Sequence, residues 1–366
     1  MMMRTTMTRT MALVLGLGLT VTALASCSTS PGSSPSPTPE TATVSFTDDA
    51  RRTVDVPSPS TLTRISPSGA LSQMFLMAIA PDLMVSLGSA YSVSDAAFIP
   101  ASVAQLPAVG ELYGSSTINY ESVAALAPQL VVDVGEPKDT IVDDMNGITD
   151  KLAVPAVHIT ATLQSTPDAF RKLGALLGRQ DKGEQLAEYC EKILSQTDSI
   201  MSQVGADKVS ALYLMGSDGL NVLPATSYHS EVLDDVTNNL AVVANPSSSG
   251  MGNQTDLEQI STWNPAVMLF APGSVYATVA TDPTWRGLTA VSTGRYYEVP
   301  EGPYNWMGQP PSVNRYLSMI WLTSLLYPQY ATFDLYQEVK DYYSLFYGYD
   351  LTQDGFDALT AHSLPK

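Results

Sequence analysis

The chain has 366 residues, in which 36 acidic side chains outnumber 18 basic ones, giving a formal charge of −18. A surface of this charge disfavours nucleic acid and anionic membrane surfaces as partners. The two cysteines, Cys27 and Cys190, are too few for a disulfide framework or a cysteine-based zinc site. Cys190 falls in a helical pattern and is predicted to be a packed apolar residue.

The N-terminus has the pattern of a targeting segment. Arg4 and Arg9 precede an apolar run at 11–21 that is too short to span a bilayer as a mature helix. The letters LASC, ending at Cys27, resemble the processing site of bacterial lipoproteins. The resemblance implies that residues 1–26 are a signal peptide and that Cys27 becomes a lipidated first residue. The alternative is an ordinary secretory signal.

The next segment, residues 27–41, is rich in Ser, Pro and Thr and has no periodic apolar pattern. Such a composition cannot bury a core and is typical of an extended tether. We therefore expect an extracytoplasmic protein that is anchored to the cell membrane by lipidated Cys27 and meets the membrane through that anchor only.

Eight short apolar runs then alternate with helical segments. This alternation is typical of parallel sheets that are covered on both faces. The predicted strands are Leu62–Ser66, Met84–Leu87, Leu130–Val134 and Pro155–Thr160 in the first half, and Val209–Met215, Leu240–Val243, Val267–Ala271 and Tyr296–Val299 in the second.

One helix-to-strand unit occurs twice. The stretch NYESVAALAPQLVVDVG from Asn119 aligns without a gap with DLEQISTWNPAVMLFAPG from Asp256. Each copy has an Asx helix cap, a Glu in the first turn, a Pro that stops the helix and an apolar strand. The repeat predicts two lobes that carry the same αβ unit.

A long helix is predicted between the halves, from about Lys182 to Val204, because apolar residues recur there at helical spacing. We expect a first α/β lobe at 42–165, a helical connection at 166–204 and a second α/β lobe at 205–366.

Segments spread over nearly the whole body resemble the class III substrate-binding proteins of ABC transporters, which are receptors for ferric siderophores, haem, cobalamin and oxyanions. The segments are FTDDARRTVDVP from Phe46, AIAPDLMVSLGS from Ala78, VGELYGSSTINYESVAALAPQLVV from Val109, DPTWRGLTAVSTGRYYEVPEG from Asp282 and RYLSMIWLTSLLYP from Arg315. The resemblance implies an α/β fold of two Rossmann-like lobes with mostly parallel sheets, joined by one long helix, with a ligand cleft between the lobes. It also implies a monomer whose partners are an ABC permease and its ATPase.

The loops that follow the strands supply the candidate ligand-binding residues, because ligands of open α/β sheets bind beyond the carboxyl ends of the strands. The candidates are Ser68, Tyr91, Tyr113 and Glu136 in the first half, and Tyr228, His229, Asn305, Trp306 and Arg315 in the second.

Several candidates have a structural alternative. Tyr113 and Tyr228 could line the cleft or be half-buried packing residues. Trp306 could be a ligand platform or a lid over the core. His229 could bind a metal or an anionic ligand, or lie at the surface before a helix. Arg315 could hold a carboxylate or an oxyanion, or form a structural salt bridge.

Glu121 and Glu258 occupy the same position in the two repeats. A carboxylate in the first turn stabilises a helix by about 0.3–1 kcal/mol through its interaction with the unpaired N–H groups. The family resemblance implies a second role, since receptors of this class present one glutamate on each lobe to arginine pockets of the permease. Both roles are compatible with an exposed side chain.

No G-x-S-x-G, H-E-x-x-H, P-loop or Rossmann glycine motif occurs in the body of the chain. We therefore expect no catalytic residue, no cofactor and no site for a bare metal ion. The expected function is the capture of an iron chelate, a siderophore or haem, for delivery to the permease. A receptor for cobalamin or a molybdate-like oxyanion is the alternative within the class. An extracytoplasmic enzyme or accessory surface protein on the same fold is the alternative outside it.

Overall fold

The computed structural model describes residues 42–114, 119–247 and 250–365. The predicted signal peptide at 1–26, the lipidation site Cys27 and the tether at 27–41 lie outside this part of the chain. Among the described residues, no helix is both long enough and apolar enough to cross a membrane.

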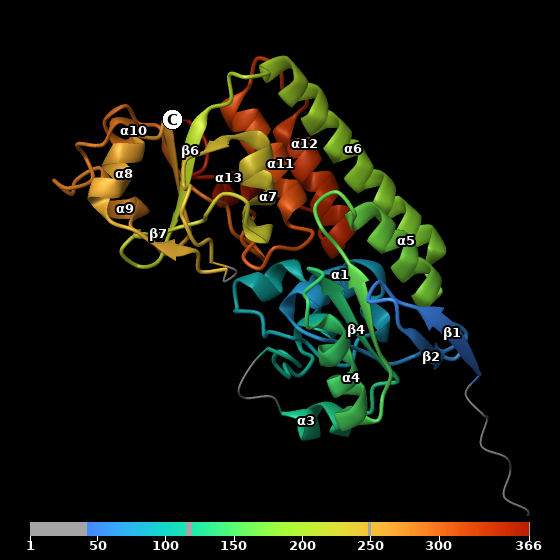
Figure 1. Cartoon of the computed structure of the whole chain (residues 1–366). Coiled ribbons are helices and arrows are strands. Elements are labelled where there is room, and N and C mark those ends of the chain that lie inside the picture. Colours follow the sequence, from blue (N-terminus) through green and yellow to red (C-terminus); the bar gives the residue numbers. More distant parts are fainter. Residues whose placement is uncertain (1–41, 115–118, 248–249, 366) are drawn as a thin grey trace, which may run out of the picture. The chain divides into compact units, whose positions relative to one another are not determined.

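Residues 42–165, predicted as the first lobe, contain an antiparallel β1–β2 pair and a parallel sheet in the order β3-β4-β5. Figure 1 labels the central strand of the parallel sheet, β4. Every residue of the central strand is buried, as expected for a strand covered on both faces. The elements of this lobe are β1 (Thr43–Thr47), β2 (Thr53–Pro57), β3 (Ile65–Pro67), α1 (Ala70–Ile79), η1 (Pro81–Leu83), η2 (Asp95–Phe98), α2 (Ala101–Ala104), α3 (Tyr120–Ala125), β4 (Leu130–Gly135), α4 (Ile141–Leu152) and β5 (Ala156–Thr160).

The run Met84–Leu87, predicted as a strand, forms only isolated bridges, from Met84 to Ile65 and from Leu87 to Ala108. The backbone of Leu87 exchanges hydrogen bonds with residues 107–109 instead of continuing along β3. The prediction of a fourth strand in this lobe is therefore wrong, because the run changes partner before a ladder can form.

The second lobe, residues 205–365, contains a mixed sheet in the order β11-β10-β6-β7-β9, with β8 paired to β6. Strands β6, β10 and β11 run parallel to their neighbours within this set, and β7 and β9 are antiparallel additions. The elements are β6 (Ser210–Met215), β7 (Asn221–Val222), η3 (Tyr228–Ser230), α7 (Glu231–Val236), β8 (Asn238–Asn239), β9 (Asn253–Gln254), α8 (Leu257–Trp263), β10 (Val267–Phe270), α9 (Tyr276–Val279), α10 (Thr289–Ser292), β11 (Tyr296–Glu298), α11 (Arg315–Leu326), α12 (Leu335–Tyr342), a π-helical turn (Tyr343–Tyr347) and α13 (Gln353–Leu359).

The strand predicted at Leu240–Val243 is wrong, because the chain leaves the sheet at that point. The side chain of Asn239 accepts a hydrogen bond from the N–H of Ala241 at 3.1 Å, which turns the backbone away from β6. Val242 is consequently 76% exposed. The paired strand is β8, which lies just before the predicted run.

The predicted repeat is present in both lobes. The side chains of Asn119 and Asp256 each accept a hydrogen bond from the N–H three residues on, at 3.0 and 2.8 Å. After the two helices, the aligned residues Ala127 and Asn264 both adopt a left-handed conformation, with φ of 44° and 45°. The strands that follow, β4 and β10, each lie between two parallel neighbours in separate sheets.

Two helices, α5 (Thr166–Leu177) and α6 (Gln180–Val204), form the connection between the lobes (Figure 1). The predicted long helix is confirmed and begins two residues earlier than expected. Gly183 permits close packing of α6 on α5, since a Cβ atom there would lie 2.6 Å from the carbonyl oxygen of Phe170.

The largest hydrophobic cluster runs through this connection. It contains residues of both sheets, such as Val132 and Leu269, together with residues of α1, α5, α6, α11 and α12. Cys190 on α6 is fully buried in it, as predicted. Residues 42–365 thus form one compact unit with three sheets, the β1–β2 pair and the two larger sheets, and the domain boundaries at 166 and 205 stay a prediction.

Candidate ligand cavity

A cavity of about 580 Å³ lies beyond the carboxyl ends of β3 and β4. Most of its wall comes from the first lobe, and a smaller part comes from η3 and the loop before α11 in the second. Its lining residues are Ser68, Gly69, Leu71, Ser72, Glu111, Tyr113, Asp133, Val134, Gly135, Glu136, Pro137, Lys138, Asp139, Tyr228, His229 and Pro311. The volume falls within the range of about 300–1,000 Å³ that is usual for small-molecule sites.

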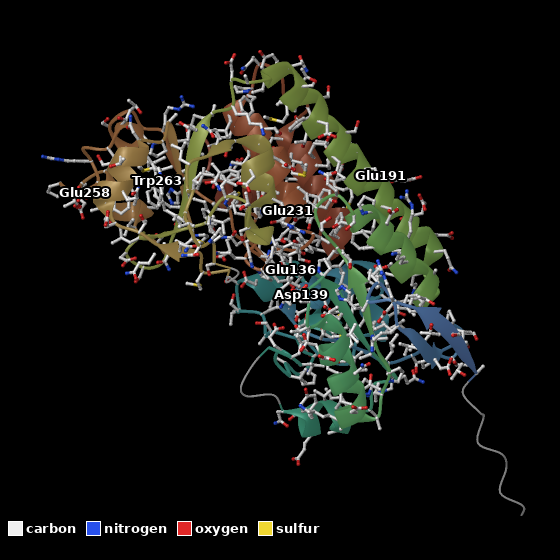
Figure 2. The ribbon with its side chains drawn as sticks, viewed as in Figure 1. Glu136, Asp139, Glu191, Glu231, Glu258 and Trp263 are labelled. Atoms are coloured by element: carbon white, nitrogen blue, oxygen red, sulfur yellow. The ribbon has the colours of Figure 1, made fainter. Side chains whose placement is uncertain are left out.

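Five of the predicted ligand residues meet at this cavity: Ser68, Tyr113, Glu136, Tyr228 and His229. Ser68 and Glu136 follow the parallel strands β3 and β4 and therefore lie at one edge of that sheet. Tyr228 and His229 reach the cavity from η3 of the second lobe. Figure 2 shows Glu136 together with Asp139, directly after β4.

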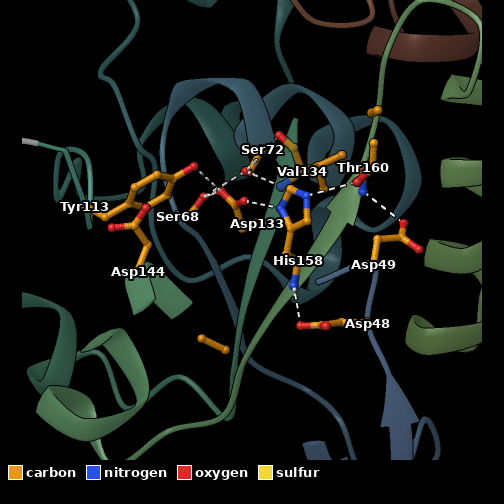
Figure 3. Close-up of polar contacts among 12 residues, drawn as sticks. Asp48, Asp49, Ser68, Ser72, Tyr113, Asp133, Val134, Asp144, His158 and Thr160 are labelled. Carbon is orange, nitrogen blue, oxygen red and sulfur yellow. Dashed lines mark hydrogen bonds and ion pairs between the residues drawn. The ribbon is translucent and has the colours of Figure 1, made fainter. Parts of the chain in front are cut away.

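The floor of the cavity is a polar network around Asp133, on β4 (Figure 3). One carboxylate oxygen, Oδ1, accepts a short hydrogen bond from the hydroxyl of Ser68 and another from that of Tyr113 at 3.0 Å. The other oxygen, Oδ2, lies 2.6 Å from Nδ1 of His158. Asp133 is only 3% exposed, so these partners compensate the cost of burying its charge.

His158 lies opposite Asp133 in the register of β4 and β5. Its second ring nitrogen, Nε2, is 3.1 Å from the hydroxyl of Thr160. The Thr160–His158–Asp133 order matches a catalytic triad in residue type. However, Thr160 does not line the cavity, and Ser68 donates directly to Asp133 and not to the histidine. The histidine therefore supports the floor and has no nucleophile to activate at the cavity surface.

Neither Asp133 nor His158 was among the predicted site residues. The available signal was a single carboxylate inside the apolar run Leu130–Val134, because an acidic residue in a buried strand requires a partner.

The wall beside this floor carries three more carboxylates, those of Glu111, Glu136 and Asp139. Glu111 accepts a hydrogen bond from the N–H of Ala70, the first residue of α1, at 3.0 Å. Desolvation of its carboxylate raises the pKa of Glu111. Lys138 is the one Lys or Arg among the lining residues that the structure describes, and its Nζ lies 5.2 Å from the centre of the Tyr113 ring. Burial, and then the charge of Asp133, raise the pKa of Tyr113.

Tyr228 is one of the second-lobe residues that line the cavity. Its hydroxyl donates to the carbonyl of Ala161 at 2.6 Å, and its ring lies 4.9 Å from the guanidinium of Arg315. Arg315 is 1% exposed and forms a short ion pair with Glu231 behind that ring. Arg315 therefore forms a structural salt bridge, the alternative role given for it above, and it does not line the cavity. His229 lies on the wall, where Gly250 packs against its ring.

The remaining candidates also lie away from the cavity. Asn305 and Trp306 are 2% and 0% exposed, and the Asn305 amide donates to the hydroxyl of Tyr213 at 3.1 Å within the second lobe. The hydroxyl of Tyr91 lies 2.5 Å from that of Tyr304, so this pair joins the first lobe to the second. These residues hold the structure together, and none of them lines the cavity.

Glu121 and Glu258 are exposed in the first turns of α3 and α8, on different lobes. Glu258 lies at the outer surface of α8 (Figure 2). Neither residue lines the cavity. Among the described residues, no group of three or more His, Cys, Asp and Glu side chains is arranged to hold a metal ion.

Comparison with known proteins places this geometry in context. Residues 89–303 match the sequence profile of a family described as periplasmic binding protein. No curated protein is significantly similar to the chain in sequence.

Solved structures share the fold. An ABC transporter solute binding protein from Sulfurospirillum deleyianum is 24% identical, with a TM-score of 0.79 over 87% of this chain and 99% of that one. The molybdate-bound periplasmic binding protein of Haemophilus influenzae is 19% identical, with a TM-score of 0.68 over 84% and 99%. The periplasmic catecholate-siderophore binding protein of Vibrio cholerae is 18% identical, with a TM-score of 0.57 over 76% and 98%.

Proposed function

Because the chain belongs to the periplasmic binding protein family, we propose that it is the extracytoplasmic solute receptor of an ABC importer. The proposed solute is a metal chelate, and we favour an iron chelate. The observation that carries this proposal is the cavity of about 580 Å³ at the strand ends, to which both lobes contribute. Relatives that bind molybdate and a catecholate siderophore support a small metal-containing solute.

The absence of a bare-metal cluster from the described part of the chain favours a chelate over a free cation. A metal that arrives with its own ligands needs only a wall of suitable shape, charge and aromatic surface. Tyr113 and Tyr228 provide one aromatic ring from each lobe, and Ser68, Glu136 and His229 are the proposed polar contacts.

In the proposed cycle the lobes close modestly about residues 166–204, and the loaded receptor docks on the permease through Glu121 and Glu258. Replacement of both glutamates by glutamine is expected to leave solute affinity unchanged and to reduce uptake in cells. The pair Glu188→Gln and Asp150→Asn is the control, since both side chains are exposed and do not line the cavity. Equal uptake by the two double variants would contradict the docking role.

Membrane attachment through Cys27 is the second part of the proposal. Cys27→Ser is expected to abolish incorporation of labelled fatty acid and to leave solute affinity unchanged. Labelling of the variant at the level of the parent chain would contradict lipidation at this residue.

Solute binding is tested by the thermal stability of the purified chain against ferric siderophores, haem, a corrinoid and molybdate. A solute present at about 100 times its Kd stabilises the folded state by about 2.7 kcal/mol. The proposal predicts such a shift for at least one iron chelate. No shift with any member of the panel would contradict the receptor function.

A further inference from the structure

We propose that the cavity selects a positively charged metal complex and rejects anionic ones, because Glu111 itself occupies the anion position of the site. This inference rests on the proposed receptor function and names the charge class of its solute.

The anion position is the N-terminus of α1, which opens on the cavity beside Ser68. A helix N-terminus presents unpaired N–H groups and a partial positive charge, and it commonly binds phosphates and other oxyanions. Here the carboxylate of Glu111 accepts the N–H of Ala70 at 3.0 Å. It packs so closely on Gly69 that a Cβ atom there would lie 1.7 Å from the carboxylate. An incoming oxyanion would have to displace this side chain.

The rest of the wall adds negative charge. Glu136 and Asp139 follow β4 on the same side of the cavity, and Lys138 is the one Lys or Arg that opposes them among the described lining residues. The guanidinium of Arg315 lies behind the Tyr228 ring and forms an ion pair with Glu231. Among the side chains that the structure describes, none lining the cavity offers the forked guanidinium contact that holds oxyanions and carboxylates.

The hydroxyls of the cavity floor also present hydrogen-bond acceptors to a solute. Ser68 and Tyr113 each have one hydroxyl proton, and each donates it to Asp133. Toward the cavity these two oxygens can only accept hydrogen bonds. Asp133 is therefore a positioning residue, which sets the direction of hydroxyls that face the solute. Apart from Lys138, the charged lining side chains and these two hydroxyls present acceptors, and a solute with N–H donors and positive charge matches them.

The decisive experiment uses ferric complexes of one linear trihydroxamate with three end groups. The free protonated amine makes the complex positive, the acetylated amine makes it neutral and the succinylated amine makes it negative, while the metal site is the same. Calorimetric titration of the purified chain is expected to give about tenfold tighter binding of the positive complex than of the negative one.

The variant Glu136→Gln with Asp139→Asn is expected to reduce this preference to about twofold, and the control pair Glu188→Gln with Asp150→Asn to leave it unchanged. Tyr113→Phe tests the hydroxyl directions without removing a charge, and it is expected to weaken the positive and neutral complexes equally.

The outcomes separate the two proposals. Tighter binding of the negative complex, equal binding of all three complexes, or binding of only haem or molybdate overturns the charge preference and leaves the receptor function standing. A preference that survives the Glu136→Gln, Asp139→Asn pair unchanged also overturns it. No binding of any chelate, corrinoid or oxyanion overturns the receptor function and the charge preference with it.

Discussion

The two repeats place very different residues at the same position of the strands β4 and β10. In the alignment that pairs Asn119 with Asp256, Asp133 of β4 corresponds to Phe270 of β10. Asp133 gathers Ser68, Tyr113 and His158 into the cavity floor. Phe270 is fully buried and packs on Trp285, with ring centroids 5.7 Å apart. The repeat thus supplies one scaffold twice, and only the first copy has become the polar part of the proposed solute site.

The largest expected effect comes from placing an aspartate at position 270, so that the second repeat matches the first. Phe270→Asp would bury a carboxylate among apolar side chains with no His158 equivalent beside it. We expect a loss of about 4–5 kcal/mol or more in the free energy of unfolding at pH 7, measured by denaturant titration. Phe270→Leu is the control and should cost no more than about 1–2 kcal/mol. A loss below about 2 kcal/mol for the aspartate would show that the two positions are interchangeable.

Removal of His158 tests the same comparison in the first lobe. His158→Ala leaves Oδ2 of Asp133 buried without its partner and creates a cavity between β4 and β5, so a loss of about 3 kcal/mol is expected. Solute affinity should fall as well, because the carboxylate no longer holds Ser68 and Tyr113 in place. His362→Ala, at an exposed histidine of the second lobe, should change stability by less than about 1 kcal/mol. Equal effects of the two substitutions would contradict the support that His158 gives to the floor.

A smaller effect, a gain in anion binding, is expected when the N-terminus of α1 loses its contact with Glu111. Glu111→Ala frees the N–H of Ala70, so molybdate or phosphate should stabilise the variant by about 0.5–1 kcal/mol more than the parent chain. The measurement is thermal unfolding with and without the anion at constant ionic strength. Identical anion effects on both chains would show that Glu111 does not block an anion site.

The smallest expected effect is a change in the pH dependence of stability. The pKa of Glu111 is raised in the folded chain, mainly by desolvation, above its ordinary value of 4.5. For an acid whose folded pKa is raised, the stabilising contribution is fully present below pH 4.5 and is lost as pH rises through the folded pKa. Glu111→Gln removes this titration, so the variant should gain stability relative to the parent chain as pH rises from about 4.5 to 7. A constant difference over that range would contradict the raised pKa.

The repeated unit could be predicted from the sequence because its signals are local. An Asx cap, a Glu in the first turn and a helix-stopping Pro act within a few residues of one another, and the structure keeps them in register. Leu240–Val243 was mispredicted because apolar composition alone does not reveal that the Asn239 side chain turns the backbone away from the sheet.

The site was predicted in part for a related physical reason. Strand-end loops are recognisable in sequence, and Ser68, Tyr113 and Glu136 were selected in this way. They line the cavity, and their contact with a solute stays a prediction. The pairing of Asp133 with His158 depends on the register of two strands separated by α4, and Arg315 depends on its contact with distant Glu231. Such long-range pairings have no local signal in the sequence. The cavity floor around Asp133 and the ion pair of Arg315 could therefore be recognised only from the structure.

The position of the bound metal is the sharpest test of a solute site at the ends of β3 and β4. Crystals of the chain saturated with the positively charged ferric trihydroxamate complex would locate the iron by its anomalous scattering. The account predicts one iron peak inside the cavity, bordered by Tyr113, Glu136 and Tyr228. A peak elsewhere, such as the smaller cavity beside Phe98 and Glu298, would contradict it.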